Sequence, residues 1–240
     1  MEKKTILVTG ASSGIGRAIA LACSAKGMIV VLNGRNVERL NETLALMSGE
    51  GHIILPADLT DGAQRQALAS QVPVLDGVVH CAGIASRVLC KMLEQDDVQH
   101  VMEANFNAPV LLQATLLQEK KIASGASIVF IASAAATMPS VGNAIYSASK
   151  AALIAYAKCL SLELAARKIR VNCISPAMVW TDLALVVATE EQLREAEQAY
   201  PLKRYARPED IAPMAVYLLS DEASWITGSN YELTGGALTL

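Results

Sequence analysis

Cysteine pairs at metal-binding spacing are missing from this 240-residue chain. The five cysteines are odd in number and contain no Cys-x-x-Cys pair: Cys23, Cys81, Cys90, Cys159 and Cys173. This absence argues against a disulfide framework and against a zinc ribbon. We therefore expect buried thiols in a reducing compartment. The three histidines, at 52, 80 and 100, also lack ligand spacing, so no metal site is predicted.

The chain also lacks a block of basic residues. Its 20 lysines and arginines are balanced by 23 aspartates and glutamates, which gives a net charge of −3. A nucleic-acid-binding protein is expected to carry a basic patch or stripe. No nucleic-acid partner is therefore predicted.

No hydrophobic run is long enough to span a membrane. The longest stretch without charge, residues 122–149, is interrupted by Pro139, Asn143, glycines and many serines. The apolar run near the N-terminus ends at Thr9-Gly10, which is too short for the core of a signal peptide. We expect a cytoplasmic protein with no membrane partner.

Apolar β-branched runs alternate with helical patterns along the whole chain. Continuous apolar runs are typical of strands that are buried on both faces of a parallel sheet. Strands are expected at residues 5–9, 28–32, 52–55, 77–80, 127–132 and 170–175. Helices are expected at residues 15–26, 37–48, 61–72, 95–121, 149–167 and 208–220. This order predicts a single α/β domain over residues 1–240, with a three-layer, Rossmann-like, doubly wound parallel sheet.

The segment from Ala177 to Tyr200 has no predicted strand. It begins with apolar residues, Leu183, Leu185 and Val186, and continues with several glutamates. We expect this segment, residues 177–200, to form a helical lid over a substrate.

A glycine-rich turn follows the first predicted strand and opens the first predicted helix. Glycines allow the backbone to approach a pyrophosphate, and a helix N-terminus offers unpaired N–H groups and a positive potential. An ordinary strand-to-helix turn is the alternative, but the flanking strand and helix favour a dinucleotide. The candidate cofactor-binding residues of this turn are Gly10, Ser12, Ser13, Gly14, Ile15 and Gly16.

The end of the second predicted strand lacks the acidic residue that binds the ribose 2′-hydroxyl of NAD. The chain reads Asn33-Gly34-Arg35-Asn36 there, and no acid appears before Glu38. Arg35 is suited to pair with a 2′-phosphate through charge-assisted hydrogen bonds. NADP(H) is therefore favoured over NAD(H), with a solvated surface arginine as the alternative interpretation of Arg35.

The spacing Gly-x-x-x-Gly-x-Gly, with Thr9 before it, resembles that of the short-chain dehydrogenase/reductase family, in its compact branch. The resemblance covers essentially the whole chain. It implies that Asp58, followed by Leu59, hydrogen bonds the adenine and that Cys81-Ala82-Gly83 lines the cofactor. The family usually carries Asn-Asn-Ala-Gly where this chain has His80 and Cys81 before Ala82-Gly83.

Tyr146 and Lys150 are four residues apart at the start of a predicted helix, so their side chains share a face. The pair alone is a weak signal. The resemblance adds Ser133 as the substrate-orienting serine and Asn105 as the catalytic asparagine, so all four expected catalytic positions are filled. The sequence also resembles the family's Pro-Gly-x-Ile/Val-x-Thr motif, which implies that Pro176, Val179 and Thr181 contact the cofactor, with Ala177 replacing the glycine.

The chemistry explains these residue types. When a hydride reaches a carbonyl carbon, negative charge grows on the oxygen, and Tyr146 supplies the proton. An ammonium group at Lys150 favours the tyrosinate and makes the phenol a better acid. The resemblance implies that Lys150 also contacts the nicotinamide ribose and that Asn105 holds a water in a proton relay.

We therefore expect an NADP(H)-dependent carbonyl reductase or alcohol dehydrogenase acting on a small molecule, with 3-oxoacyl thioester reductases as the nearest resemblance. The resemblance implies a homotetramer built through the helices at residues 95–121 and 149–167. A catalytically silent NADP-binding regulator is the main alternative. A sugar-nucleotide epimerase is less favoured, because Gly-x-x-Gly-x-x-Gly and a longer C-terminal region are both missing.

Overall fold

The computed structural model describes residues 3–138, 140–186 and 188–237. Its centre is a seven-stranded parallel sheet in the order β3-β2-β1-β4-β5-β6-β7. The strands are β1 (Thr5–Thr9), β2 (Ile29–Asn33), β3 (Ile53–Ile54), β4 (Leu75–His80), β5 (Ile122–Ile131), β6 (Arg170–Pro176) and β7 (Asn230–Leu233).

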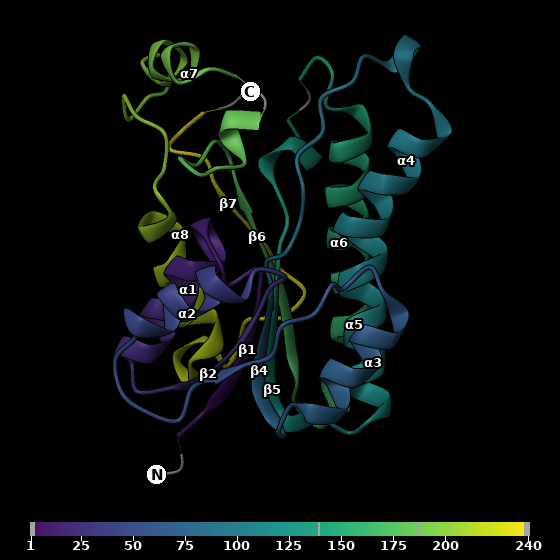
Figure 1. The fold of residues 1–240 in the computed structure, drawn as a ribbon, viewed down its shortest axis with the longest axis vertical. Coiled ribbons are helices and arrows are strands. Elements are labelled where there is room, and N and C mark those ends of the chain that lie inside the picture. Colours follow the sequence, from purple (N-terminus) through teal and green to yellow (C-terminus); the bar gives the residue numbers. More distant parts are fainter. Residues whose placement is uncertain (1–2, 139, 187, 238–240) are drawn as a thin grey trace.

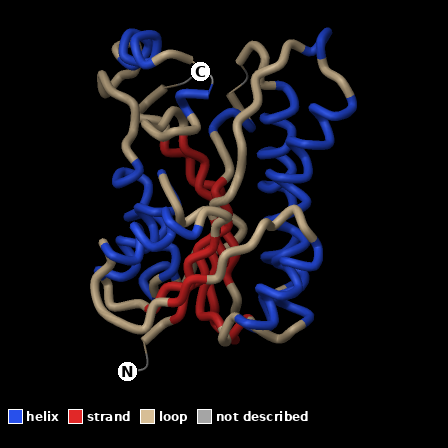
Figure 2. Tube along the Cα trace, in the orientation of Figure 1, coloured by secondary structure: helices blue, strands red, loops and turns tan. Residues whose placement is uncertain are grey.

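Helices cover both faces of this sheet and make a three-layer molecule (Figures 1 and 2). One face carries α1 (Gly14–Ala25), α2 (Val37–Ala45) and α8 (Pro208–Leu219). The other face carries α3 (Gly62–Gln71), α4 (Gln95–Met102), α5 (Ala108–Gln118) and α6 (Ala144–Glu163). The predicted Rossmann-like, doubly wound α/β fold is confirmed.

Apolar strand residues form the two cores between the layers. Leu7, Val78 and Phe130 are fully buried on the side of α5 and α6, and Ile6, Val8 and Val79 are buried on the side of α1 and α8. Strand residues alternate between the two faces, so each face needs its own apolar set. This requirement explains why the strands read as continuous apolar runs.

The chain reverses its winding direction between β1 and β4, which are neighbours in the sheet. Ligands of open α/β sheets bind at the carboxyl ends of the strands at such a switch point. Thr9 closes β1 there, and its Oγ1 accepts hydrogen bonds from the N–H groups of Cys81 (3.0 Å) and Ala82 (3.1 Å) just after β4. The two loops that follow β1 and β4 are thereby held together.

The predicted element boundaries need four main corrections. The strand expected at residues 127–132 is longer, because β5 begins at Ile122. The expected helix 95–121 ends as α5 at Gln118 and is divided by a π-helical turn over Glu103–Asn107. Pro109 has no N–H to donate to the carbonyl of Asn105, which favours a break in the regular α-helical hydrogen bonding at this point. The helix α6 begins at Ala144, not at residue 149, and β7 was not predicted because its four residues make a short edge strand.

Candidate active site

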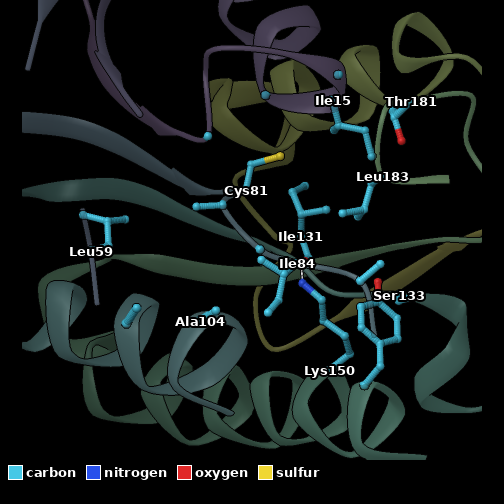
Figure 3. Close-up of a pocket in the computed structure, with 18 of the residues that line it drawn as sticks. Ile15, Leu59, Cys81, Ile84, Ala104, Ile131, Ser133, Lys150, Thr181 and Leu183 are labelled. Carbon is cyan, nitrogen blue, oxygen red and sulfur yellow. Dashed lines mark hydrogen bonds between the residues drawn. The ribbon is translucent and has the colours of Figure 1, made fainter. Parts of the chain in front are cut away.

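A cavity of about 1190 Å³ opens at the carboxyl ends of the central strands. The glycine-rich turn, the loops after β2, β3 and β4, the end of β5, the start of α6 and the segment after β6 all line it. Figure 3 shows Ile15 and Thr181 on one side of this cavity and Ser133 and Lys150 on the other. The fold thus brings together motifs that are more than 100 residues apart in the sequence.

The glycine-rich turn has the backbone that its glycines predict. Gly10 (φ +66°) and Gly14 (φ +51°) both adopt left-handed conformations. A Cβ on Gly10 would lie 3.0 Å from the backbone of Ala82, and a Cβ on Gly16 would collide with the carbonyl oxygen of Gly10. Any side chain at these positions would force the turn away from the neighbouring loop and from α1.

The N-terminus of α1 is left open at this turn. Its N-cap residue, Ser13, makes no side-chain hydrogen bond to the helix, and the first turn contains no acidic residue. The helices α2, α3 and α7 (Glu190–Glu197), in contrast, are capped by the side chains of Asn36, Asp61 and Thr189. An uncapped helix N-terminus behind a glycine turn is suited to bind an anion.

Arg35 and Asp58 face each other where the second and third strands end. Arg35 Nη1 lies 3.8 Å from Asp58 Oδ2, and the arginine side chain is 75% exposed. Hydrogen bonds from the backbone and side chain of Thr60 lower the pKa of Asp58, so its carboxylate is charged at neutral pH. The side chain of Asn33 is hydrogen bonded to the chain after β3, because its Nδ2 donates to the carbonyls of Leu55 and Ala57.

Tyr146 and Lys150 lie on one face of α6, below the end of β5. Lys150 is 5% exposed, and its Nζ donates a 3.0 Å hydrogen bond to the carbonyl of Ile131. The same nitrogen lies 6.0 Å from the centre of the Tyr146 ring. Ser133 stands two residues after the end of β5, lies near Lys150 (Figure 3) and hydrogen bonds with Tyr146. The predicted catalytic serine, tyrosine and lysine therefore come together at one end of the cavity.

Burial controls the protonation of this cluster. Desolvation lowers the pKa of Lys150 to about 8, which leaves the amine mostly protonated at pH 7. Desolvation also raises the pKa of Tyr146, while a hydrogen bond with Ser133 opposes the increase. The nearby Cys81 thiol stays neutral because burial raises its pKa to about 12. At neutral pH the phenol thus holds its proton beside a cation.

Asn105 does not line this cavity. Its side chain is fully buried in the π-helical turn, where Oδ1 accepts from the N–H of Ile84 at 2.8 Å. Its Nδ2 donates to the carbonyl of Ile84 (3.1 Å) and to the hydroxyl of Ser149 (3.2 Å). The side chain therefore holds the loop after Gly83 on α6. Ser149 was missed by the sequence analysis, because a serine inside a helix carries no signal of its own.

His80 and Cys81 occupy the end of β4 and the first position after it. His80 is buried, its Nε2 lies 3.0 Å from Oε1 of Gln113 in α5, and its ring stacks on Phe130 with centroids 4.6 Å apart. Burial lowers the pKa of His80 to about 4, so the ring is neutral. Cys81, Ala82 and Gly83 line the cavity.

The segment after β6 closes the cavity on the other side. Pro176, Val179 and Thr181 line the cavity, and Thr181 packs against the glycine turn, since a Cβ on Gly14 would lie 3.1 Å from its Cγ2. Val179 pairs with Ala206 in an isolated parallel bridge. The glycine turn and the start of the expected lid are therefore in contact.

The expected lid has two parts with different packing. Leu183 projects into the cavity (Figure 3), whereas Leu185 and Val186 are 52% and 70% exposed. The later part, which contains α7, rests on a small core of its own. Trp180 Nε1 donates to Glu197 at 2.8 Å. The buried members of this small core are Ala184, Leu193, Tyr200, Tyr205 and Ala237.

The described residues contain no helix long and apolar enough to cross a membrane. Within the same residues, no group of three or more His, Cys, Asp and Glu side chains is arranged to hold a metal ion.

Known proteins resemble this chain over almost its full length. A family model described as Enoyl-(Acyl carrier protein) reductase matches residues 10–237. The 3-oxoacyl-[acyl-carrier-protein] reductase FabG of Rickettsia felis is 35% identical over 235 residues, which cover 98% of this chain and 97% of that protein.

Solved structures show the same likeness in three dimensions. A short chain dehydrogenase/reductase family protein superimposes with a TM-score of 0.88 at 34% identity, covering 98% of this chain and 97% of the other. A variant of actinorhodin polyketide ketoreductase with NADPH gives a TM-score of 0.90 at 29% identity, with 98% and 97% covered. The chain belongs to the short-chain dehydrogenase/reductase family and is an NAD(P)-dependent oxidoreductase.

Proposed function

We propose that this protein is an NADP(H)-dependent reductase of ketones or aldehydes, which also oxidises the corresponding alcohols. The observation that carries the proposal is the cluster of Ser133, Tyr146 and Lys150 at one end of a cavity whose other end is a glycine turn on an uncapped helix. Such a cavity is suited to hold a dinucleotide with its reactive ring beside the phenol.

The residues present fit this cofactor. The backbone at the helix N-terminus forms a cradle without Cβ atoms. Gly10 and Gly14 are left-handed there, and a side chain at Gly16 would collide with the turn. When bound, the nicotinamide supplies or accepts the hydride. We assign its contacts to Gly10, Ser12, Ser13, Gly14, Ile15, Gly16, Arg35, Asp58, Leu59, Cys81, Ala82, Gly83, Tyr146, Lys150, Pro176, Val179 and Thr181.

NADP(H) is favoured over NAD(H) by the charges at the adenosine end. No carboxylate stands between residues 33 and 36, and the exposed guanidinium of Arg35 is available to a 2′-phosphate. The likeness to a ketoreductase solved with NADPH supports the same choice.

Tyr146 is the proton donor in this proposal, and Ser133 orients the substrate oxygen. Lys150, still protonated at pH 7, stabilises the tyrosinate that remains after donation. Because the side chain of Asn105 is engaged by Ile84 and Ser149, its part in a proton relay falls to its backbone carbonyl. Pro109 lacks the N–H that would bond to this carbonyl in an α-helix.

We further propose that residues 177–200 act as the substrate lid and that 3-oxoacyl thioesters are among the substrates. The second point is supported by the likeness to a 3-oxoacyl-[acyl-carrier-protein] reductase. A cytoplasmic homotetramer is proposed as well. The apolar side chains of Leu111 in α5 and Leu162 in α6, 44% and 80% exposed, support association through these helices.

The test is NADPH oxidation, followed by absorbance, against a panel of ketones, aldehydes and 3-oxoacyl thioesters. Turnover of at least one carbonyl, faster with NADPH than with NADH, is the expected result. Tight NADPH binding without turnover of any carbonyl would instead favour the catalytically silent regulator. Turnover that proceeds equally well with both cofactors would contradict the NADP(H) assignment.

A further inference from the structure

An ion pair joins two parts of the cavity wall that are far apart in the sequence. Arg39, in the first turn of α2, places its Nη1 3.1 Å from Oδ2 of Asp182. Asp182 directly follows Thr181, which packs against Gly14 of the glycine turn. Both members of the pair line the cavity. The pair therefore connects α2 to the start of the lid, beside the turn assigned to the cofactor phosphates.

Arg39 can exchange its partner in this ion pair for another anion. The side chains of Arg39 and Asp182 are 51% and 71% exposed, and exposed ion pairs of this kind contribute little to stability. A phosphate dianion is a stronger partner for a guanidinium, because it carries more charge and accepts two parallel hydrogen bonds. Arg39 thus loses little when it leaves Asp182 for a phosphate.

The charges at the adenosine end are balanced in pairs. Among the described residues that line this end of the cavity, Arg35 and Arg39 carry the positive charges, facing Asp58 and Asp182 respectively. Arg17, in α1, already donates hydrogen bonds to the carbonyl of Ser12 and to the side chains of Thr43 and Glu42. A ligand with two negative charges would match two arginines.

Building on the NADP(H) assignment, we propose that Arg39 is a second specificity-determining residue. Its guanidinium leaves Asp182 and binds the cofactor's 2′-phosphate together with Arg35. Asp182 then acts as an internal competitor that weakens phosphate binding. Binding of the cofactor also releases the first residues of the lid from α2.

The experiment measures binding to the full-length protein by calorimetry, without any turnover. Adenosine 2′,5′-bisphosphate is compared with adenosine 5′-monophosphate, which lacks the 2′-phosphate, and NADPH is compared with NADH. Arg39→Ala should weaken binding of the bisphosphate and of NADPH by about 10-fold, the range for one charge-assisted contact, and leave the other two ligands within about 2-fold. Asp182→Asn should strengthen the same two ligands by about 2- to 5-fold, as expected for an exposed pair.

In the Arg39→Ala background, Asp182→Asn should no longer increase the affinity for the bisphosphate or NADPH. The guanidinium for which Asp182 competes with the phosphate is then absent. Lys4→Ala and Asp221→Asn are matched controls. They remove the same charges from an ion pair outside the cavity and should change no affinity.

Three outcomes would overturn the inference. If Arg39→Ala weakened all four ligands equally, the role would be structural. If Asp182→Asn weakened NADPH binding, the ion pair would serve to hold the lid in place and would not compete with the phosphate. If Arg35→Ala abolished the preference for the bisphosphate and Arg39→Ala did not, Arg39 would play no part while the NADP(H) assignment stood. A wild-type protein that bound both adenosine ligands equally would contradict that assignment itself.

Discussion

The side chain of Asn105 pairs with both backbone polar groups of Ile84, accepting from its N–H at 2.8 Å and donating to its carbonyl at 3.1 Å. One amide thus replaces the hydrogen bonding that a neighbouring strand would give to this loop. Ile84 follows Gly83, where a Cβ would lie 3.0 Å from Asn105 Oδ1 and 3.4 Å from Lys150 Nζ. The loop after β4, the π-helical turn and the catalytic end of α6 therefore form one packed unit.

Asn105→Ala should reduce the free energy of unfolding by roughly 2–3 kcal/mol, because it leaves backbone groups of Ile84 unpaired. Urea denaturation measures this change. Asn41→Ala is the control, since that exposed side chain makes a single local hydrogen bond to the carbonyl of Val37. Equal stability of the Asn105 and Asn41 variants would contradict the bracing role.

Tyr146→Phe should lower the rate of single-turnover hydride transfer by about 10²- to 10⁴-fold, the usual cost of losing a general acid. NADPH affinity should stay nearly unchanged, because the phenol oxygen is not a main cofactor anchor. Stopped-flow absorbance and fluorescence titration give the two quantities. Tyr217→Phe, in α8 and outside the cavity, serves as the control. Full activity in Tyr146→Phe would show that the proton comes from another group.

Lys150→Met should stabilise the protein without cofactor, because a buried cation is replaced by an apolar side chain of similar length. The folded pKa of Lys150, about 8, lies below the ordinary value of 10.5, so the unfolded chain binds more protons between these two pH values. The penalty is therefore complete below pH 8 and disappears as the pH rises to 10.5.

The measured quantity is the difference in unfolding free energy between Lys150→Met and wild type, at several pH values. We expect this difference to be about 2–3 kcal/mol at pH 7 and to shrink steadily above pH 8. Taking the difference removes the opposite pH dependence of the buried thiol of Cys23, whose pKa burial raises to about 12 and which has no electrostatic coupling to Lys150. A difference that is constant from pH 7 to pH 10.5 would contradict the shifted pKa.

Arg35→Ala should weaken NADPH binding by about 10-fold or more and leave NADH binding unchanged, because only NADPH carries the 2′-phosphate. Fluorescence titration of both cofactors measures the effect. Lys26→Ala, at the far end of α1, is a control for the lost charge. A preference for NADH that persists in Arg35→Ala would exclude the assigned role.

The lid should exchange its amide hydrogens unevenly in the protein without ligands. The amides of Leu185 and Val186, whose side chains are 52% and 70% exposed, should exchange fast, whereas α7 is held by the core around Leu193 and Tyr200 and should exchange more slowly. Cofactor and substrate together should slow exchange at residues 182–186. Full protection of this segment without ligand, unchanged on their addition, would contradict the lid.

Much of the fold was determined by local sequence patterns. Continuous apolar runs such as Ile6 to Val8 predicted buried parallel strands, because only strands covered on both faces need apolar residues at every position. The glycine turn and the Tyr146–Lys150 spacing were also visible, since each depends on backbone geometry within a few residues. The edge strand β7 was missed because a four-residue strand on one neighbour has too weak a pattern.

Only the tertiary structure decided how distant groups act on one another. The sequence placed Asn105 among the catalytic residues, but only the packing against Ile84 and Ser149 shows that its side-chain amide is buried, so that its proposed part in the proton relay falls to its backbone carbonyl. The pKa of Lys150 depends on desolvation by surrounding layers, and the pairing of Arg39 with Asp182 spans 143 positions. Local patterns determine which elements form, whereas burial, protonation and long-range ion pairs depend on how those elements meet in space.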